Sequence, residues 1–362
     1  MKEISGIPAL AHASNSLALP EQLAQRAADA VREVLAEAAA ENTTRSYATA
    51  LRYWAGWYAA RYGIELSLPV PEAVVLQFVV DHVTRRSTEN DLTWELPPVV
   101  DQALVASGLK ARPGPWTLTT VRHRVAVLST AHRLKQLPNP CEQPAVRLVL
   151  SRARRAAVKR GERPRKKTAI TLTELEAMLA TCDDSLEGIR DRALLCFAFS
   201  SGGRRRSEVA AADMRDLRRI GDKGYIYRLE HSKTQQEGVT ATSTPDKPVL
   251  ERAAVALEEW IAEAGIQEGA IFRRLWKRRV GPALSPAAVA EIVQRRAKLA
   301  GIDGDFAGHS LRSGFVTEAS RQGVSLAAIM QMTEHRSVSS VIGYFQTGGA
   351  SANPAARLLE DS

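Results

Sequence analysis

The chain has 362 residues, 45% hydrophobic and 25% charged, which is an ordinary composition for a globular protein. Its formal net charge of +9 favours a polyanionic partner, nucleic acid before a membrane surface. Three cysteines are too few for a disulfide framework or a cysteine-based metal cluster. The sequence offers neither a signal-peptide pattern nor a run of 18 apolar residues, so we expect no membrane association and a reducing, cytoplasmic location.

The first half of the chain is predicted to be helical. Residues 1–19 are small and polar and are interpreted as a flexible arm. Beyond them, apolar residues recur at helical spacing, which predicts a bundle of four or five helices within 20–158. Asn42 and Thr43 are expected to cap the second of these helices, and residues 87–116 to form a long connection with one short helix. The helical patterns cover residues 21–39, 44–62, 72–86, 117–136 and about 143–158.

A strongly basic segment follows this bundle. Residues 151–167 hold nine Lys and Arg residues and one acid, Glu162, so this stretch carries most of the net charge of the chain. Residues 159–168 are interpreted as a basic linker between two domains. Each Lys or Arg that neutralises a phosphate releases counterions, so such a linker suits DNA binding.

The second half mixes helices with a small β-structure. Residues 190–200 form an apolar helical run that ends at Gly202 and Gly203. Tyr225–Glu230 and Val239–Ser243 are predicted to pair as strands. A helix is expected to begin at Pro248, and Ser285 to cap another.

Residues 308–345 concentrate side chains suited to phosphoryl transfer. His309 and Arg312 are three residues apart, His335 follows later, and Tyr344 lies nine residues beyond it. An arginine offers a fork of donors that matches a phosphate, and a histidine exchanges protons near neutral pH. A tyrosine hydroxyl can act as a nucleophile that forms a covalent intermediate. Each residue alone would be unremarkable, as a helical histidine, a surface arginine or a core tyrosine.

This order of residues resembles the C-terminal signature of the tyrosine recombinases, the phage integrase family. Residues 200–217, SSGGRRRSEVAAADMRDL, resemble the arginine-containing block that the family carries upstream. Between the two blocks, Lys233 stands where the family has a lysine on a β-hairpin. The resemblance covers three ordered blocks across about 150 residues.

The resemblance implies a mainly α fold with a small β-hairpin or sheet. An N-terminal helical bundle of the core-binding, SAM-like kind would occupy 20–158, and an α+β tyrosine recombinase catalytic domain would occupy 169–347. Residues 348–362 would form a tail that contacts another protomer. The partners implied are double-stranded DNA and further copies of the chain, as a tetramer on DNA in the nucleoid.

The implied activity is site-specific recombination through a 3′-phosphotyrosyl intermediate, without a cofactor or metal. Tyr344 would be the nucleophile, Arg205 and Arg312 would clamp the phosphate, and Lys233 would protonate the leaving 5′ oxygen. His335 would donate to a phosphate oxygen, His309 would handle the tyrosine proton, and Glu208 would orient the site. The candidates for DNA binding are Arg45, Arg52, Arg122, Arg124, Arg152, Arg154, Arg155, Lys159, Arg160, Arg163, Arg165, Lys166 and Lys167.

Two positions depart from the family pattern. Arg204, Arg205 and Arg206 are consecutive, and Arg205 is selected only because it lies three residues before Glu208, as the family pattern requires. Glu334 precedes His335 where the family usually has glycine, and we expect its carboxylate to point away from the phosphate. On that expectation, Glu334→Gly would leave DNA cleavage intact or faster.

Three other functions are alternatives to a recombinase. A type IB topoisomerase shares this chemistry but acts alone, whereas a recombinase joins several protomers on two duplexes. A non-catalytic DNA-binding relative would not need all six core positions. A metal-dependent phosphodiesterase would need a cluster of carboxylates or histidines at ligand spacing, which the sequence lacks.

Overall fold

The computed structural model describes residues 41–162, 167–229, 245–277 and 279–342. The chain divides into two compact units, Met1–Pro164 and Arg165–Ser362. Their boundary falls within the basic segment expected to be a linker. Within the described ranges, no helix is long and apolar enough to cross a membrane.

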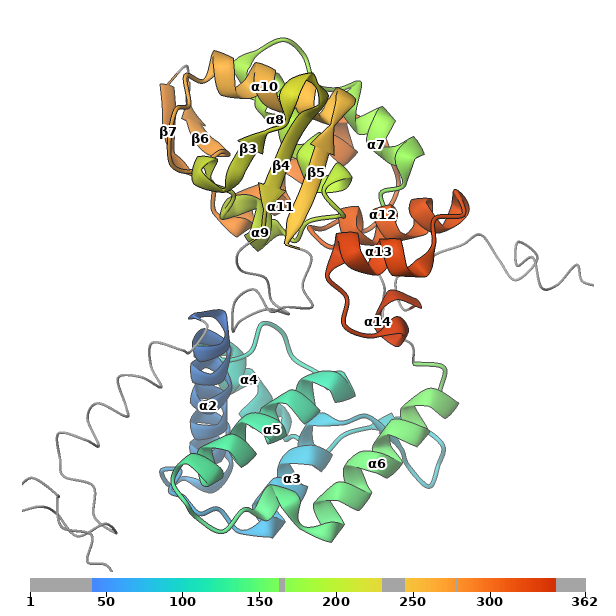
Figure 1. Cartoon of the computed structure of the whole chain (residues 1–362). Helices are drawn as coiled ribbons and strands as arrows, with labels where there is room; N and C mark the ends of the chain where they lie inside the picture. The colour runs from blue at the N-terminus through green and yellow to red at the C-terminus, as the bar shows by residue number, and fades with distance from the viewer. Residues whose placement is uncertain (1–40, 163–166, 230–244, 278, 343–362) are drawn as a thin grey trace, which may run out of the picture. The chain divides into compact units, whose positions relative to one another are not determined.

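The described part of the first unit is built from five helices and one very short strand pair (Figure 1). The expected cap at Asn42 and Thr43 is wrong, because both residues lie inside the first described helix. The short helix expected within 87–116 is present as α4. The elements are α2 (Glu41–Tyr62), α3 (Glu72–His82), β1 (Arg85–Arg86), β2 (Leu92–Thr93), α4 (Pro98–Ala106), α5 (Leu118–Leu134), a 3₁₀ turn (Pro140–Glu142) and α6 (Pro144–Lys159).

Aromatic side chains form the centre of this unit. Trp54 on α2 stacks on Phe78 on α3, with ring centroids 3.7 Å apart. Buried His82 must donate its Nδ1 hydrogen to the Phe78 carbonyl, because a carbonyl can only accept, so its Nε2 accepts from the Tyr53 hydroxyl at 2.7 Å. The ring is neutral because burial lowers the pKa of His82 to about 3, despite that carbonyl contact.

The second unit packs helices around a three-stranded antiparallel sheet of order β3-β4-β5 and carries a second hairpin, β6-β7 (Figure 1). Its elements are α7 (Leu172–Leu179), α8 (Leu186–Ser200), α9 (Arg206–Ala210), β3 (Leu217–Arg219), β4 (Gly224–Arg228), β5 (Asp246–Leu250), α10 (Glu251–Glu263), β6 (Arg273–Trp276), β7 (Arg279–Ala283), α11 (Pro286–Leu299), α12 (Ser310–Arg321), α13 (Leu326–Thr333) and α14 (Val338–Ile342), with two 3₁₀ turns (Met214–Asp216 and Gly221–Lys223).

Two expectations about the sheet need correction. The strand that pairs with β4 is Asp246–Leu250, and the predicted strand Val239–Ser243 lies outside the described residues. Pro248 was expected to begin a helix, yet it pairs with Ile226 inside β5, and the helix begins three residues later. Proline lacks a ladder donor but tolerates an edge strand, and β5 is an edge of this sheet.

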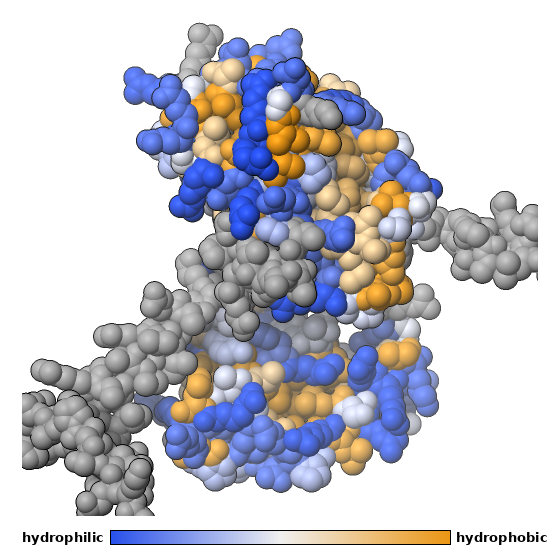
Figure 2. Space-filling view, in the orientation of Figure 1, coloured by the Kyte–Doolittle hydropathy of each residue, from blue (hydrophilic) through white to orange (hydrophobic). Residues whose placement is uncertain are grey.

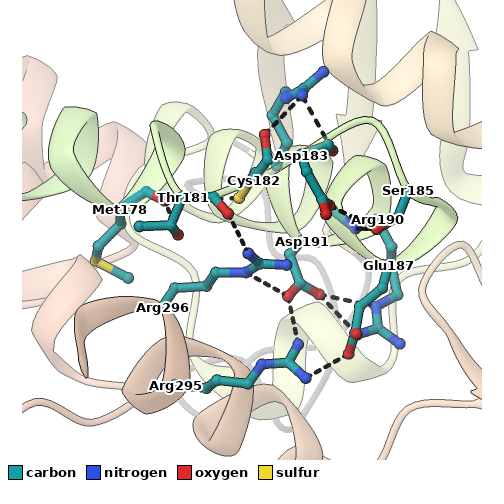
Figure 3. Close-up of polar contacts among 12 residues, drawn as sticks. Met178, Thr181, Cys182, Asp183, Ser185, Glu187, Arg190, Asp191, Arg295 and Arg296 are labelled. Carbon is teal, nitrogen blue, oxygen red and sulfur yellow. Dashed lines mark hydrogen bonds and ion pairs between the residues drawn. The ribbon is translucent and has the colours of Figure 1, made fainter. Parts of the chain in front are cut away.

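A buried carboxylate ties α8 to α11 (Figure 3). Asp191 accepts from Arg190 on its own helix at 2.8 Å and from Arg295 and Arg296 on α11 at 2.6 and 2.7 Å. The side chain of Asp191 is fully buried, so these three guanidinium groups replace the water it would otherwise bind. The network fixes α11 against α8, the apolar helix that the Gly202–Gly203 turn follows.

Candidate active site

The Gly202–Gly203 turn brings three segments together. Both glycines have positive φ, 104° and 65°, where residues with a Cβ are strained. A Cβ on Gly203 would lie 2.4 Å from the Arg312 Cα, and one on Gly202 would lie 2.2 Å from the Met332 carbonyl oxygen. The turn after α8 therefore packs directly on α12 and on the C-terminal end of α13.

The three consecutive arginines that follow have different environments. Arg204 is 1% exposed, and its Nη2 donates to the Met332 carbonyl at 2.5 Å. Arg205 is partly exposed and places Nη1 2.5 Å from Glu208 Oε1, whereas Arg206 is exposed. Arg205 thus combines an accessible guanidinium with a close carboxylate contact.

Glu208 lies in the first turn of α9, where it is buried between these arginines. Its Oε2 accepts from the Arg205 backbone N–H at 3.1 Å and lies 3.6 Å from Arg204 Nη1. Burial alone would raise the pKa of Glu208, but the positive charges of Arg204, Arg205 and Arg312 outweigh it and lower the pKa. Glu208 is therefore a carboxylate at neutral pH and can orient the Arg205 guanidinium.

Arg312 reaches the same place from α12. It is fully buried, its Nη1 donates to the Gly203 carbonyl at 3.4 Å, and its Nη2 donates to the Thr333 carbonyl. His309 is the N-terminal cap residue of the same helix and is exposed. The start of α12 therefore places His309 at the surface and Arg312 inside.

His335 follows α13 and is held by Thr333. Its Nδ1 lies 2.7 Å from Thr333 Oγ1, and that hydroxyl donates its own hydrogen to the Ile329 carbonyl at 2.7 Å. The Thr333 oxygen therefore accepts from His335 Nδ1–H, which leaves Nε2 as an acceptor in the neutral ring. Burial, together with the nearby charges of Arg312, Arg205 and Arg204, lowers the pKa of His335 to about 3.

Three cations hold three successive carbonyl groups at the C-terminal end of α13. Lys247 on β5 donates to the Gln331 carbonyl at 2.6 Å, Arg204 to that of Met332, and Arg312 to that of Thr333. The last carbonyls of a helix lack partners within the helix and carry its negative dipole end, so cations are favourable there. Arg204, Lys247 and Thr333 were not singled out from the sequence, which carries no signal for carbonyl contacts across a fold.

Lys233 and Tyr344 lie outside the described residues. Residues 230–244, which include Lys233, lie in the sequence between the paired strands β4 and β5. The structure brings together Arg205, Glu208, Arg312 and His335, and places Lys247 and Glu334 beside them. Within the described ranges, no group of three His, Cys, Asp or Glu side chains could hold a metal ion.

The candidate DNA-binding residues differ in exposure. Arg45 and Arg52 on α2 are exposed, seven residues apart, and therefore lie on one side of that helix. Arg124 is half-buried, and its guanidinium stacks on the Tyr53 and Trp116 rings at 4.3 Å, so it serves the core of the first unit. Other exposed candidates are Arg122, Arg152, Arg154, Arg155 and Lys159. Arg160 pairs with Glu162, and exposed Lys167 pairs with Asp305. Arg163, Arg165 and Lys166 lie outside the described residues.

The model of the phage integrase family matches residues 168–348. The chain belongs to this family. Its members, the tyrosine recombinases, cleave and rejoin DNA through a covalent tyrosine intermediate. The matched region includes all six residues expected to be catalytic.

Two curated relatives agree with this assignment. The chain is 35% identical over 238 residues to an integrase/recombinase XerD homolog of Selenomonas ruminantium, covering 63% of this chain and 68% of the relative. It is 26% identical over 263 residues to the recombinase Cre of Escherichia phage P1, covering 67% and 74%.

Solved structures show the same fold at low sequence identity. The integrase of transposon Tn1549, solved with transposon right-end DNA, matches with a TM-score of 0.57 at 14% identity, over 92% of this chain and 98% of that one. The XerH site-specific recombinase, solved on a palindromic difH substrate, matches with a TM-score of 0.53 at 15% identity, over 87% and 79%. The fold is thus a tyrosine recombinase catalytic domain with an N-terminal helical region.

Proposed function

We propose that this protein is a site-specific DNA recombinase that cuts and rejoins DNA through a 3′-phosphotyrosyl link formed by Tyr344. The observation that carries the proposal is the convergence of Arg205, Glu208, Arg312 and His335 from three separate segments of a phage integrase domain. Two guanidinium groups and an imidazole gathered around a carboxylate suit one phosphate group.

Arg205 and Arg312 would bind the two non-bridging oxygens of the scissile phosphate. Negative charge on these oxygens grows as the tyrosine attacks, so fixed guanidinium groups stabilise the transition state more than the ground state. Glu208 holds Arg205 in position through the 2.5 Å contact. Lowering of the Glu208 pKa keeps this carboxylate charged, so its contact with Arg205 persists at neutral pH.

The covalent step exchanges one phosphate ester for another. The Tyr344 oxygen forms a bond to phosphorus while its proton passes to His309, and the bond from phosphorus to the 5′ oxygen breaks. Lys233 gives a proton to that leaving oxygen. Rejoining is the same step with a 5′ hydroxyl as the nucleophile, so the phosphotyrosyl link conserves the energy of the DNA backbone and no cofactor or metal is needed.

His335 would donate from Nε2 to a non-bridging oxygen, and this requires a proton that the neutral ring lacks. The phosphate would offset the arginine charges that lower the His335 pKa, so DNA binding should raise that pKa and take up a proton. Calorimetry of DNA binding in two buffers of different ionisation enthalpy measures this uptake. Uptake that is unchanged in His335→Gln would contradict the assignment.

The partner is double-stranded DNA, engaged by a helical domain within 20–158, a basic linker over 159–168 and a catalytic domain over 169–347. Exposed arginines on α2 and α6 suit phosphate contacts, and their binding should weaken steeply with salt. We further propose a tetramer on two duplexes, in which residues 348–362 contact a neighbouring protomer, and a nucleoid location.

The test is strand exchange rather than cleavage alone. Two labelled duplexes that carry DNA flanking the gene of this protein are incubated with it, and the products are resolved by size. Recombinant products and a complex of two duplexes are expected. Relaxation of supercoiled DNA without recombinant products would identify a topoisomerase, and tight, salt-sensitive binding without strand exchange or covalent adducts would identify a non-catalytic DNA-binding protein.

A further inference from the structure

Glu334 occupies a backbone position that ordinarily suits glycine. It ends α13 with φ 57° and ψ 38°, in the left-handed region where a Cβ is unfavourable. Its side chain is only 8% exposed, so a carboxylate is buried in a strained turn directly before His335. A left-handed backbone and a buried carboxylate are each unfavourable in isolation, so this carboxylate needs a binding partner.

The carboxylate of Glu334 binds Lys247 on β5. The Lys247 side chain is fully buried, and its Nζ lies 2.5 Å from Glu334 Oε1 and 2.6 Å from the Gln331 carbonyl oxygen. One ammonium group therefore joins the edge strand of the sheet to the last turn of α13 and to the residue after it. A buried ion pair with an additional carbonyl contact has a narrow range of allowed geometries.

The position of this pair connects it to the active site. Arg204 and Arg312 hold the Met332 and Thr333 carbonyls, so Lys247 completes a row of three cations along the end of α13. Thr333 in turn holds the His335 ring through its hydroxyl. A shift of the Glu334 turn would therefore move the imidazole relative to Arg205 and Arg312.

We propose that Lys247 and Glu334 are positioning residues, which fix the turn at residue 334 and so hold His335 against the scissile phosphate. The proposal rests on the function proposed above, because it assigns the pair a role in that same reaction. It reverses the expectation for Glu334→Gly. Although glycine suits the backbone, the substitution removes the carboxylate from the buried Lys247 ammonium, so we now expect slower cleavage.

The test compares isosteric variants in single-turnover cleavage. Glu334→Gln removes the negative charge of the pair, Lys247→Met removes the ammonium group, and the double variant leaves no buried charge at either position. The substrate is DNA nicked beside the cleavage point, so that the covalent product accumulates. All three variants should cleave at least tenfold more slowly at saturating DNA, with DNA affinity within twofold of wild type. A double variant that cleaves at the wild-type rate would overturn the proposal.

A matched control comes from an exposed ion pair in the same unit. Arg252 Nη1 lies 2.5 Å from Glu176 Oε1, with both side chains about half exposed. Arg252→Met and Glu176→Gln make the same chemical changes at the same distance, and they should leave the cleavage rate unchanged. Melting temperatures of all variants are measured alongside, and the assay temperature is set well below the lowest of them, so that unfolding does not produce the loss.

A second substrate separates the proposed role of His335 from that of Lys233. A bridging sulfur at the 5′ position makes a leaving group that departs without a proton. The Glu334→Gln defect should persist on this substrate, because His335 acts on a non-bridging oxygen. Full rescue by sulfur would show that the pair acts through leaving-group protonation and would overturn the proposal. If wild type itself forms no adduct, the proposed function fails; if wild type and Glu334→Gln cleave equally fast, only the positioning role fails.

Discussion

The carboxylate of Glu208 lies between two consecutive arginines, with Oε1 2.5 Å from Arg205 Nη1 and Oε2 3.6 Å from Arg204 Nη1. The two arginines nevertheless face different surroundings, since Arg204 is buried against a helix end and Arg205 is partly exposed. One acid thus serves a structural arginine and a candidate catalytic one.

Three neighbouring substitutions separate these roles. Arg205→Gln should lower the cleavage rate by about 100- to 1,000-fold, as loss of a transition-state donor does, with little change in stability. Arg204→Gln should instead lower the free energy of unfolding by about 3–5 kcal/mol, because it breaks a buried ion pair. Arg206→Gln, on the exposed neighbour, is the control for both measurements. A stable Arg205→Gln variant with wild-type cleavage would contradict the choice of Arg205.

Thr333→Val tests the orientation of His335. The substitution keeps the shape of the side chain but removes the hydroxyl that accepts from His335 Nδ1 at 2.7 Å. We expect cleavage to fall roughly tenfold, less than the about 100- to 10,000-fold lost with a whole acid–base group, since the ring stays in place and loses only its fixed tautomer. Nitrogen NMR of the imidazole should show hydrogen on Nδ1 in wild type and a mixture of tautomers in the variant. Thr173→Val, at an exposed position on α7, is the control. Hydrogen on Nε2 in wild-type protein at pH 7 would refute the arrangement.

The first unit should be sensitive to acid because of His82. Its pKa is about 3 in the folded chain and about 6.5 in the unfolded chain, so between these values the unfolded state binds more protons. The contribution of neutral His82 to the free energy of unfolding is fully present above about pH 6.5 and is lost as the pH falls toward 3. The loss is about 1.4 kcal/mol for each unit by which the folded and unfolded pKa values differ. Urea unfolding followed by tryptophan fluorescence between pH 7.5 and 4 measures this slope. His82→Gln should be less stable at pH 7 but should show a flatter slope, and a slope as steep as in wild type would exclude His82 as the cause.

Asp191→Asn should destabilise the second unit. The amide preserves the shape of the side chain but removes the charge that three arginines share (Figure 3). Leaving buried guanidinium groups without their carboxylate costs about 3–5 kcal/mol. Denaturant unfolding measures the change, and Asp184→Asn is the control, since that side chain is almost fully exposed. A decrease of less than about 1 kcal/mol in the free energy of unfolding would show that water solvates the three guanidinium groups almost as well as the Asp191 carboxylate does.

Local signals in the sequence predicted most helices well. The Ser285 cap is confirmed, because a cap residue contacts backbone groups only a few positions away. The helix start predicted at Pro248 is wrong, since a proline that starts a helix and one on an edge strand look alike without the partner strand. The short strands β3, β6 and β7 were missed because three to five residues carry little periodicity.

The site was predicted as a set of residues but not as a structure. The order of Arg205, Glu208, Arg312 and His335 along the chain identified the chemistry, and these four do converge. The partners of Arg204 and Lys247 are carbonyl groups more than 80 residues away along the chain, so no local sequence pattern predicts these contacts. The exposed positions of Val324 and Val338 were likewise not predicted. Figure 2 shows that hydrophobic residues also lie on the surface of the second unit.

The most direct test of the account is the covalent link to Tyr344. Wild type and Tyr344→Phe are incubated with nicked DNA from the region flanking the gene, and SDS-resistant protein–DNA adducts are resolved on a denaturing gel. An adduct is expected in wild type only, with the DNA mapped by mass spectrometry to the peptide that contains Tyr344. An adduct of equal yield in Tyr344→Phe would show that another residue is the nucleophile and would contradict the central claim.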